Sequence, residues 1–324
     1  MARAIVMRAP GGPEVLNVEN VEVGHPSAGQ ARLRQTAVGV NFHDIYVRNG
    51  LYKTLPLPGI PGLEAVGVVE AIGPDVKQVK VGDRVGCLTH TYGSYAEARL
   101  ADANALIKLP DSLDDRTAAA TLLRGLTAQM LVHRAHKIEP GQIVLVHAAS
   151  GGVGRLVCQW AHHLGATVIG TVGSEEKARS ARRNGCDHVI FYRTENFVER
   201  VQAITGGRGV DVAYDSVGKD TFMGSMTCLA RLGHMVNFGQ ASGPVDPISM
   251  SLLFQKSNSV TRPNLFHYIA DRSRREEMTA SLFKVLADGV ITAGSTNEYR
   301  FEDIGRAQRD MEDRKTIGAV ILTL

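Results

Sequence analysis

The sequence predicts a mixed α/β protein with two domains, a β-rich module and a doubly wound parallel sheet covered by helices. Three observations support this prediction. The chain has 324 residues, which suits two domains better than one core. Residues 1–122 read as short β segments broken by Gly and Pro, and from residue 123 strand-like and helix-like segments alternate. We therefore expect one domain at 1–122 with 266–324 and a second at 123–265.

Composition and charge exclude several other classes of protein. Hydrophobic residues make up 44% and charged residues 21% of the chain, which allows a buried core without disulfides. The 36 basic and 33 acidic residues are scattered, so no nucleic-acid partner is expected. We find no signal-peptide core and no apolar stretch long enough to span a membrane. Cys87, Cys158, Cys186 and Cys228 are widely spaced, which favours reduced thiols in the cytoplasm.

The expected strands of the first domain are short and alternate between apolar and polar residues. The clearest alternation runs over Ala31–Val38, as in a sheet with one buried face. A long amphipathic helix, Arg274–Asp288, and a closing strand, Ala319–Leu322, form a tail that we expect to return to this domain. The other expected strands are Arg3–Arg8, Gln30–Val40, Ala65–Ile72, Arg84–Cys87 and Gly93–Leu100.

The second domain begins with a helical pattern near Thr117, after which strands and helices alternate. This alternation is typical of a parallel sheet with helices on both faces. The expected strands are Ile143–Ala148, Thr167–Val172, His188–Phe191, Val210–Asp215 and His234–Phe238. The expected helices between them are Val153–Leu164, Glu175–Asn184, Asn196–Thr205 and Thr221–Leu229.

The strongest chemical signal is a glycine-rich turn between the strand Ile143–Ala148 and the helix Val153–Leu164. The N–H groups at the start of a helix attract anions, and glycines let the backbone approach a pyrophosphate. A purely structural turn is the alternative, but the next strand also lies at the spacing of a dinucleotide-binding fold. The expected cofactor-binding residues are Ser150, Gly151, Gly152, Val153 and Gly154.

The end of the second strand of this domain distinguishes NAD from NADP. An NAD site usually carries Asp or Glu about 20 residues beyond the glycines, whereas this strand ends in Gly173 and Ser174. Lys177, one turn into the next helix, and Tyr192 and Arg193, after the third strand, could bind a 2′-phosphate. Taken singly, either cation could be an ordinary solvated charge. Together the five residues favour NADP.

Motifs along most of the chain point to a known family. They are Gly11–Leu16, Gly39–Asp44, Pro61–Glu64, Val81–Val85, Ala148–Gly154, Tyr214–Gly218 and Thr261–Pro263. With these motifs the chain resembles the medium-chain dehydrogenase/reductase superfamily, and more closely its zinc-free quinone oxidoreductases related to ζ-crystallin. The resemblance implies a GroES-like catalytic domain and a Rossmann domain, with the active site in the cleft between them.

Two residues depart from the zinc-dependent alcohol dehydrogenases of this superfamily. Asn41 stands where those enzymes have a catalytic Cys, and Leu63 where they have a catalytic His. Neither side chain can replace a thiolate or an imidazole as a zinc ligand. The resemblance therefore implies hydride transfer without a metal, to an acceptor that is already electrophilic, such as a quinone or a conjugated enone.

By family position, Asn41, Tyr46 and Tyr52 surround the nicotinamide and the acceptor. Asn41 could bond a ribose hydroxyl, the carboxamide or an acceptor oxygen, and the tyrosines could donate to a developing oxyanion. The alternative is that both tyrosines only pack the mouth of the cleft. The resemblance adds four residues on the cofactor side, which are Thr127, Ser216, Phe238 and Gly239.

The favoured function is an NADPH-dependent quinone oxidoreductase without a catalytic metal. An NADPH-dependent enal or enone reductase is the enzymatic alternative, and a non-catalytic crystallin-like or RNA-binding protein is the alternative of another class. RNA binding has no aromatic and basic platform to support it. The resemblance also implies a homodimer, which we expect to form edge to edge through the strand His234–Phe238. The physiological acceptor is not predicted.

Overall fold

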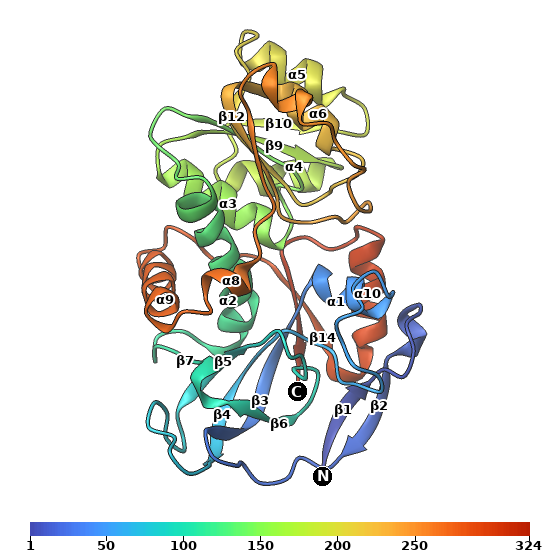
Figure 1. The fold of residues 1–324 in the computed structure, drawn as a ribbon, viewed down its shortest axis with the longest axis vertical. Helices are drawn as coiled ribbons and strands as arrows, with labels where there is room; N and C mark the ends of the chain where they lie inside the picture. The colour runs from blue at the N-terminus through green and yellow to red at the C-terminus, as the bar shows by residue number, and fades with distance from the viewer. The chain divides into compact units, whose positions relative to one another are not determined.

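The computed structural model describes all 324 residues, which form two compact units (Figure 1). Unit 1 comprises Met1–Leu123 and Ala293–Leu324, and unit 2 comprises Arg124–Thr292. The return to unit 1 comes at Ala293 and not at residue 266, where we expected it. The long helix α9 (Arg272–Ala287) accounts for this difference, because it packs within unit 2. Its Leu282 lies against Gly125.

Unit 2 is built on a six-stranded parallel sheet with the strand order β10-β9-β8-β11-β12-β13. Counted from β8, this is the order 3-2-1-4-5-6 of doubly wound dinucleotide-binding folds. The prediction of a doubly wound parallel sheet is confirmed. The strands are β8 (Ile143–Val146), β9 (Thr167–Val172), β10 (His188–Phe191), β11 (Val210–Asp215), β12 (Leu229–Asn237) and β13 (Ser259–Thr261).

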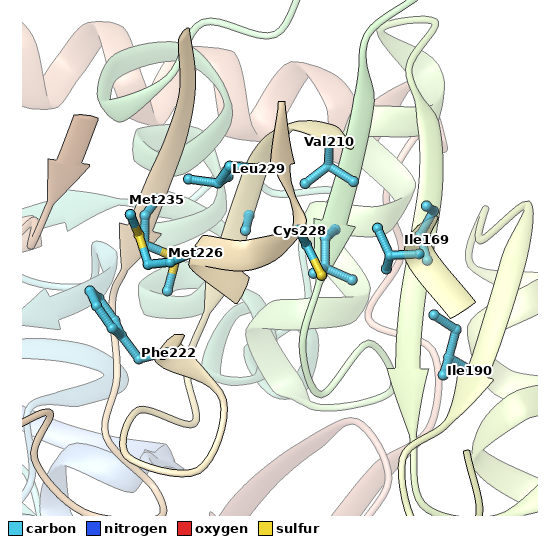
Figure 2. Packing of buried hydrophobic residues seen from close by; sticks show 11 residues of the cluster. Ile169, Ile190, Val210, Phe222, Met226, Cys228, Leu229 and Met235 are labelled. Atoms are coloured by element: carbon cyan, nitrogen blue, oxygen red, sulfur yellow. The ribbon is translucent and has the colours of Figure 1, made fainter. Parts of the chain in front are cut away.

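Helices bury the two faces of this sheet. Side chains that alternate along the strands, such as Ile169, Ile190 and Met235, gather with Phe222 and Met226 in one apolar cluster (Figure 2). The helices that supply this cluster are α5 (Phe197–Ile204) and α6 (Phe222–Cys228). Helices α3 (Gly152–His163) and α4 (Glu175–Arg183) pack against β8, β9 and β10. All four helices begin and end within one residue of their expected bounds.

The expected edge strand is internal, so the route that we predicted for a dimer is wrong. The residues His234–Val236 of β12 pair with β11 on one side and with β13 on the other. The edge strand beyond β12 is β13, whose three residues Ser259–Thr261 are too few to show an alternating pattern. Because both sides of β12 are already hydrogen-bonded, it cannot pair with a second copy of the chain.

Unit 1 is built on a sheet of the order β14-β15-β3-β4-β5-β7, in which β6 also pairs with β3. All neighbours are antiparallel except β14 and β15. A separate two-stranded sheet joins β1 (Ala2–Val6) and β2 (Asn17–Val21). The strands of the larger sheet are β3 (Gln30–Val40), β4 (Glu64–Ile72), β5 (Arg84–Leu88), β6 (Ala98–Asp102), β7 (Leu106–Lys108), β14 (Thr296–Arg300) and β15 (Ala319–Thr323).

The strand that we expected at Gly93–Leu100 begins later, at Ala98. Tyr92 and Gly93 both have positive φ, 62° and 92°, so the backbone turns here and is not extended. The N–H of Gly93 donates to the carbonyl of Ile60 at 2.8 Å, which fixes this turn against the Pro- and Gly-rich loop. The turn brings Tyr92 toward residues that lie about 40 to 50 positions earlier in the chain.

Short helices complete the two units, and the sequence pattern did not predict them. Unit 1 holds α1 (Phe42–Arg48) and α10 (Ile304–Glu312), and unit 2 holds α7 (Ser251–Phe254) and α8 (Leu265–Tyr268). The division between the units falls within α2 (Asp115–Met130), which a π-helical turn at Leu131–Ala135 follows. No helix combines the length and the apolar character that crossing a membrane requires.

Candidate active site

Most of the expected cofactor-binding residues of unit 2 lie at one edge of its sheet. Because β8, β9, β11 and β12 are parallel, their C-terminal ends share that edge, where α/β sheets bind ligands. The glycine-rich turn follows β8, and Gly173 and Ser174 follow β9. Ser216 follows β11, and Phe238 and Gly239 follow β12. Thr127 does not follow a strand, because it lies on α2, half-buried.

The glycine-rich turn is tight where Gly154 passes Ala148. Ala148 has a φ of 52°, and its carbonyl accepts the N–H of Gly151 at 2.8 Å. A Cβ on Gly154 would lie 2.3 Å from that same carbonyl oxygen, so only glycine fits there. Gly151 caps α3, whose first N–H groups have no partners within the helix. The turn can therefore hold an anion such as a pyrophosphate.

His147 fixes the base of this turn, and sequence reasoning missed it. The side chain is fully buried, with Nδ1 3.0 Å from Thr171 Oγ1 and Nε2 2.8 Å from Ser225 Oγ. Its ring meets Phe197 edge-on at 5.0 Å. Burial lowers the pKa of His147, which favours the neutral form of the ring. The only sequence signal was a polar residue at the end of an apolar strand.

The residues expected to distinguish NADP from NAD meet at the end of β9. A Cβ on Gly173 would lie 2.6 Å from Tyr192 Oη and 3.4 Å from Arg193 Nε, so these three residues are close neighbours. Ser174 caps α4, and its Oγ accepts the N–H of Lys177 at 3.3 Å. Tyr192 and Arg193 are exposed, and Lys177 is half-buried. The corner thus presents hydroxyl groups and two cations to a ligand.

The turns after β11 and β12 pack against each other. The N–H of Phe238 donates to the Asp215 carbonyl at 2.8 Å, and a Cβ on Gly239 would lie 2.5 Å from the Ser216 carbonyl oxygen. Arg262, which we had seen only as part of a motif, supports this arrangement. Its Nη1 donates to Gly239 O at 3.1 Å and also bonds the side chain of Asn237. Arg262 is therefore a positioning residue that sequence reasoning missed.

In unit 1, Asn41 is the N-terminal cap of α1, and buried polar groups surround it. Its N–H donates to Asp44 Oδ2 at 2.8 Å, and its Nδ2 donates to Glu64 Oε1 at 3.1 Å. Tyr95 Oη donates to the same oxygen of Asp44 at 2.8 Å, and Glu64 Oε2 accepts the N–H of Leu123 at 2.8 Å. The amide of Asn41 is thus fixed in direction before any ligand binds.

Tyr46 and Tyr52 lie together. Tyr46 is on α1 and is 7% exposed, and its ring meets that of Tyr52 edge-on at 5.2 Å. The N–H of Tyr52 donates to the Tyr46 carbonyl at 2.8 Å, which fixes the loop after the helix. Tyr52 also lines a cavity of about 220 Å³ with Met7, Val47 and Lys53. These contacts suit packing and ligand binding equally.

Three further polar residues join this aromatic group, and sequence reasoning gave them no role. His43 meets Tyr52 edge-on at 5.0 Å, and its Nε2 lies 3.1 Å from Tyr92 Oη. Thr54 Oγ1 also bonds Tyr92 Oη. Burial lowers the pKa of His43 to about 4 and raises that of Tyr92. His43 was visible in the motif at Gly39–Asp44, but nothing in the sequence linked it to Tyr92.

The positions that hold zinc in the alcohol dehydrogenases are not suited to a metal here. Asn41 donates to Glu64, and Leu63 is a buried apolar residue, 2% exposed. No group of three or more His, Cys, Asp or Glu side chains is arranged to hold a metal ion.

Comparison with known proteins agrees with this architecture. An alcohol dehydrogenase GroES-like domain matches residues 27–111, and a zinc-binding dehydrogenase domain matches residues 152–284. The chain is 45% identical to a 2-haloacrylate reductase of Burkholderia sp and 43% identical to a quinone oxidoreductase of Salmonella typhimurium, over 99% of each chain. The structure of Escherichia coli quinone oxidoreductase complexed with NADPH is 41% identical, with a TM-score of 0.97 over 100% of both chains.

The two domain matches, the strand orders and the identities over the whole chain agree with one another. The fold is a GroES-like domain plus a Rossmann domain, as predicted. The chain therefore belongs to the quinone oxidoreductases of the medium-chain dehydrogenase/reductase superfamily.

Proposed function

We propose that this chain is an NADPH-dependent oxidoreductase that passes a hydride to a quinone without a catalytic metal. The observation that carries the proposal is the ligand-binding edge of unit 2, where a glycine-rich turn and a cationic corner follow adjacent parallel strands. The E. coli relative with a TM-score of 0.97 was solved with NADPH, which supports the same cofactor here. When bound, NADPH supplies the hydride, and the chain binds and orients the reactants.

The residues of unit 2 fit NADPH group by group. The tight turn at Gly154 and Ala148 leads into α3, and we assign the N–H groups at the start of that helix to the pyrophosphate. Gly173, Tyr192 and Arg193 adjoin one another, with Lys177 in the first turn of α4. We assign these residues to the 2′-phosphate. Ser216, Phe238, Gly239 and Thr127 are assigned to the nicotinamide end.

In unit 1 we assign Asn41, Tyr46 and Tyr52 to the acceptor. The fixed amide of Asn41 and the paired phenols offer hydrogen-bond donors to an oxygen that gains negative charge. Metal independence rests on Asn41 and Leu63, which cannot act as zinc ligands. A quinone needs no Lewis acid, because it is already a strong hydride acceptor.

A steady-state assay tests this function directly. The purified chain is mixed with NADPH or NADH and with 9,10-phenanthrenequinone or 1,4-benzoquinone, and cofactor oxidation is followed at 340 nm. We expect turnover with NADPH and a much lower kcat/KM with NADH. Failure to oxidise either cofactor with any quinone would refute a quinone reductase.

A second activity has a specific observation in its favour. The 2-haloacrylate reductase at 45% identity is named for a conjugated acid, not for a quinone. Reduction of a conjugated enone or enoate uses the same hydride, so the same cofactor site serves both. Adding 2-chloroacrylate and a 2-alkenal to the acceptor panel separates the two, since a quinone-specific enzyme would leave both unreduced.

We also propose a cytoplasmic homodimer that forms through β13. This strand is one of the two edge strands of the sheet, and Leu232, Met250 and Phe254 of the same unit are strongly exposed. Exposed apolar residues beside an unpaired strand edge are typical of an interface between copies. The four cysteines are free thiols, in keeping with a reducing compartment.

A further inference from the structure

One nitrogen of His43 is bound and the other is available to a ligand. Nε2 lies 3.1 Å from Tyr92 Oη, and this is the only hydrogen bond of the ring. Nδ1 has no partner in the protein, and it is not among the side-chain atoms that are buried without one. Nδ1 is therefore open to a molecule that approaches from outside the unit.

The same ring stands beside the residues assigned to the acceptor. His43 meets Tyr52 at 5.0 Å between ring centroids, and Tyr52 meets Tyr46 at 5.2 Å. His43 also lies two positions after Asn41, in the first turn of α1. A molecule in contact with Asn41 and the tyrosines is thus within reach of His43.

On its other side, His43 connects to the surface through two hydroxyl groups. Tyr92 is 3% exposed, so its hydroxyl is shielded from water, and it bonds Thr54 Oγ1 as well as His43. Thr54 is exposed. Tyr92 reaches this place with a φ of 62°, an uncommon conformation for a bulky residue and one found more often at functional sites. The three side chains form a continuous hydrogen-bonded chain from solvent to Nδ1.

The imidazole is neutral at pH 7, which decides how it can act. Burial lowers the pKa of His43 to about 4, so an imidazolium is not available as a proton donor. A neutral imidazole can still pass a proton on if it gains one at one nitrogen as it loses one at the other. Tyr92 Oη is in position to supply the proton to Nε2.

We propose that Thr54, Tyr92 and His43 form a proton relay that completes the reduction of a conjugated enone or 2-enoate. The inference rests on the proposed function and specifies its acceptor class. Hydride addition at the β-carbon of such an acceptor leaves an enolate, which needs one proton at the α-carbon. A quinone makes less use of the relay, because water readily protonates the oxygens of a reduced quinone.

The relay conserves atoms and charge. The Nδ1–H bond of His43 breaks as the α-C–H bond of the product forms, and Nε2 takes the proton of Tyr92 Oη. Tyr92 takes the proton of Thr54 Oγ1, and Thr54 takes one from water. The net change is one proton from solvent to the product, and His43 ends as the other tautomer. The hydride comes from NADPH, the reductant of the proposed function.

Two substitutions, each of which removes one member of the relay, test the proposal. Tyr92→Phe and His43→Ala are compared with wild type, using 2-chloroacrylate or a 2-alkenal and, separately, 9,10-phenanthrenequinone, with NADPH saturating. We expect kcat with the enone or enoate to fall about 100-fold, as for loss of a general acid, and kcat with the quinone to stay within about twofold. Imidazole added to His43→Ala should restore part of the lost turnover, and the quinone rate should not respond.

Two controls separate chemistry from packing. Tyr299→Phe removes a different phenol of unit 1, a half-buried one that bonds Asp310 at 2.9 Å, and it should leave both rates unchanged. In D2O the wild-type rate with the enone should fall more than the rate with the quinone. Tyr92→Phe should change the ratio of the enone rates in H2O and D2O.

Three results would overturn the relay. Equal losses with both acceptors would mean that His43 and Tyr92 only support the fold or the Tyr52 ring. Unchanged rates with the enone would mean that no relay operates. A wild-type enzyme that reduces quinones but neither enones nor enoates would contradict the acceptor class. If wild type oxidised no NADPH with any acceptor, the proposed function itself would fail.

Discussion

At the scale of single residues, we propose that the choice of cofactor depends on charge at the end of β9. Lys177 lies in the first turn of α4, beside the corner formed by Gly173, Tyr192 and Arg193. A charge-assisted hydrogen bond to a phosphate contributes about 1.5–3 kcal/mol.

Lys177→Ala should therefore raise the KM for NADPH about 10- to 100-fold and leave the KM for NADH nearly unchanged. Arg179→Ala, on an exposed position of the same helix, is the matched control and should affect neither cofactor. Equal losses for NADPH and NADH would show that Lys177 does not bind the 2′-phosphate.

The buried histidines give the stability of the chain a pH dependence with a definite sign. Burial lowers the pKa of His43 and of His234 to about 4, below the ordinary value of 6.5. Between these values the unfolded chain binds protons that the folded chain does not. The free energy of unfolding therefore decreases as the pH falls from 6.5 toward 4.

The free energy of unfolding should thus be lower at pH 5 than at pH 7, and urea titrations measure it. In His43→Phe the difference between the two pH values should be smaller than in wild type, because one depressed pKa is gone. A variant with the same pH dependence as wild type would contradict the burial of neutral His43.

At the scale of elements, the sequence predicted best where a pattern was long. The strand β3 spans 11 residues of alternating character, and its expected and observed ends coincide. The helix α1 has 7 residues and β13 has 3, too few for a period to appear. For the same reason we expected the wrong strand at the edge of the sheet. Without β13, β12 would be the edge strand.

The edge strand β13 leads to a prediction about assembly. Phe254 is 87% exposed on α7. Leu232, 76% exposed, lies in the bulged part of β12, and its N–H donates to the Lys256 carbonyl at 2.8 Å. If copies join here, Phe254→Asp should place a charge in an apolar interface and separate them. Light scattering should give about twice the 34.9 kDa monomer mass for wild type and the monomer mass for the variant. A wild-type mass of one monomer at micromolar concentration would contradict the dimer.

The candidate site was predictable to the extent that its residues follow strands or belong to motifs. Gly154 and Gly239 could be found because glycine is required where backbones come close. His43 and Tyr92 are separated by 49 positions, and only the turn at Tyr92 and Gly93 joins them. Arg262 and His147 act through backbone and buried polar groups that no local pattern reveals.

At the scale of the whole molecule, the proposed function assigns the cofactor to unit 2 and the acceptor to unit 1. Unit 2 contains the sheet edge that we assign to NADPH. Unit 1 contains the fixed amide of Asn41, the paired rings of Tyr46 and Tyr52, and the hydrogen-bonded chain from His43 to solvent. Neither unit contains a group of side chains suited to a metal ion. The account therefore requires an acceptor that is reactive without a Lewis acid.

The most direct test of this account is the rate of NADPH oxidation with 9,10-phenanthrenequinone before and after exhaustive chelation, with the metal content of the same sample measured. We expect an unchanged kcat and well under one zinc per chain, because Asn41 and Leu63 replace the ligands that zinc would need. Stoichiometric zinc, together with loss of turnover on chelation and recovery when zinc is returned, would contradict the central claim.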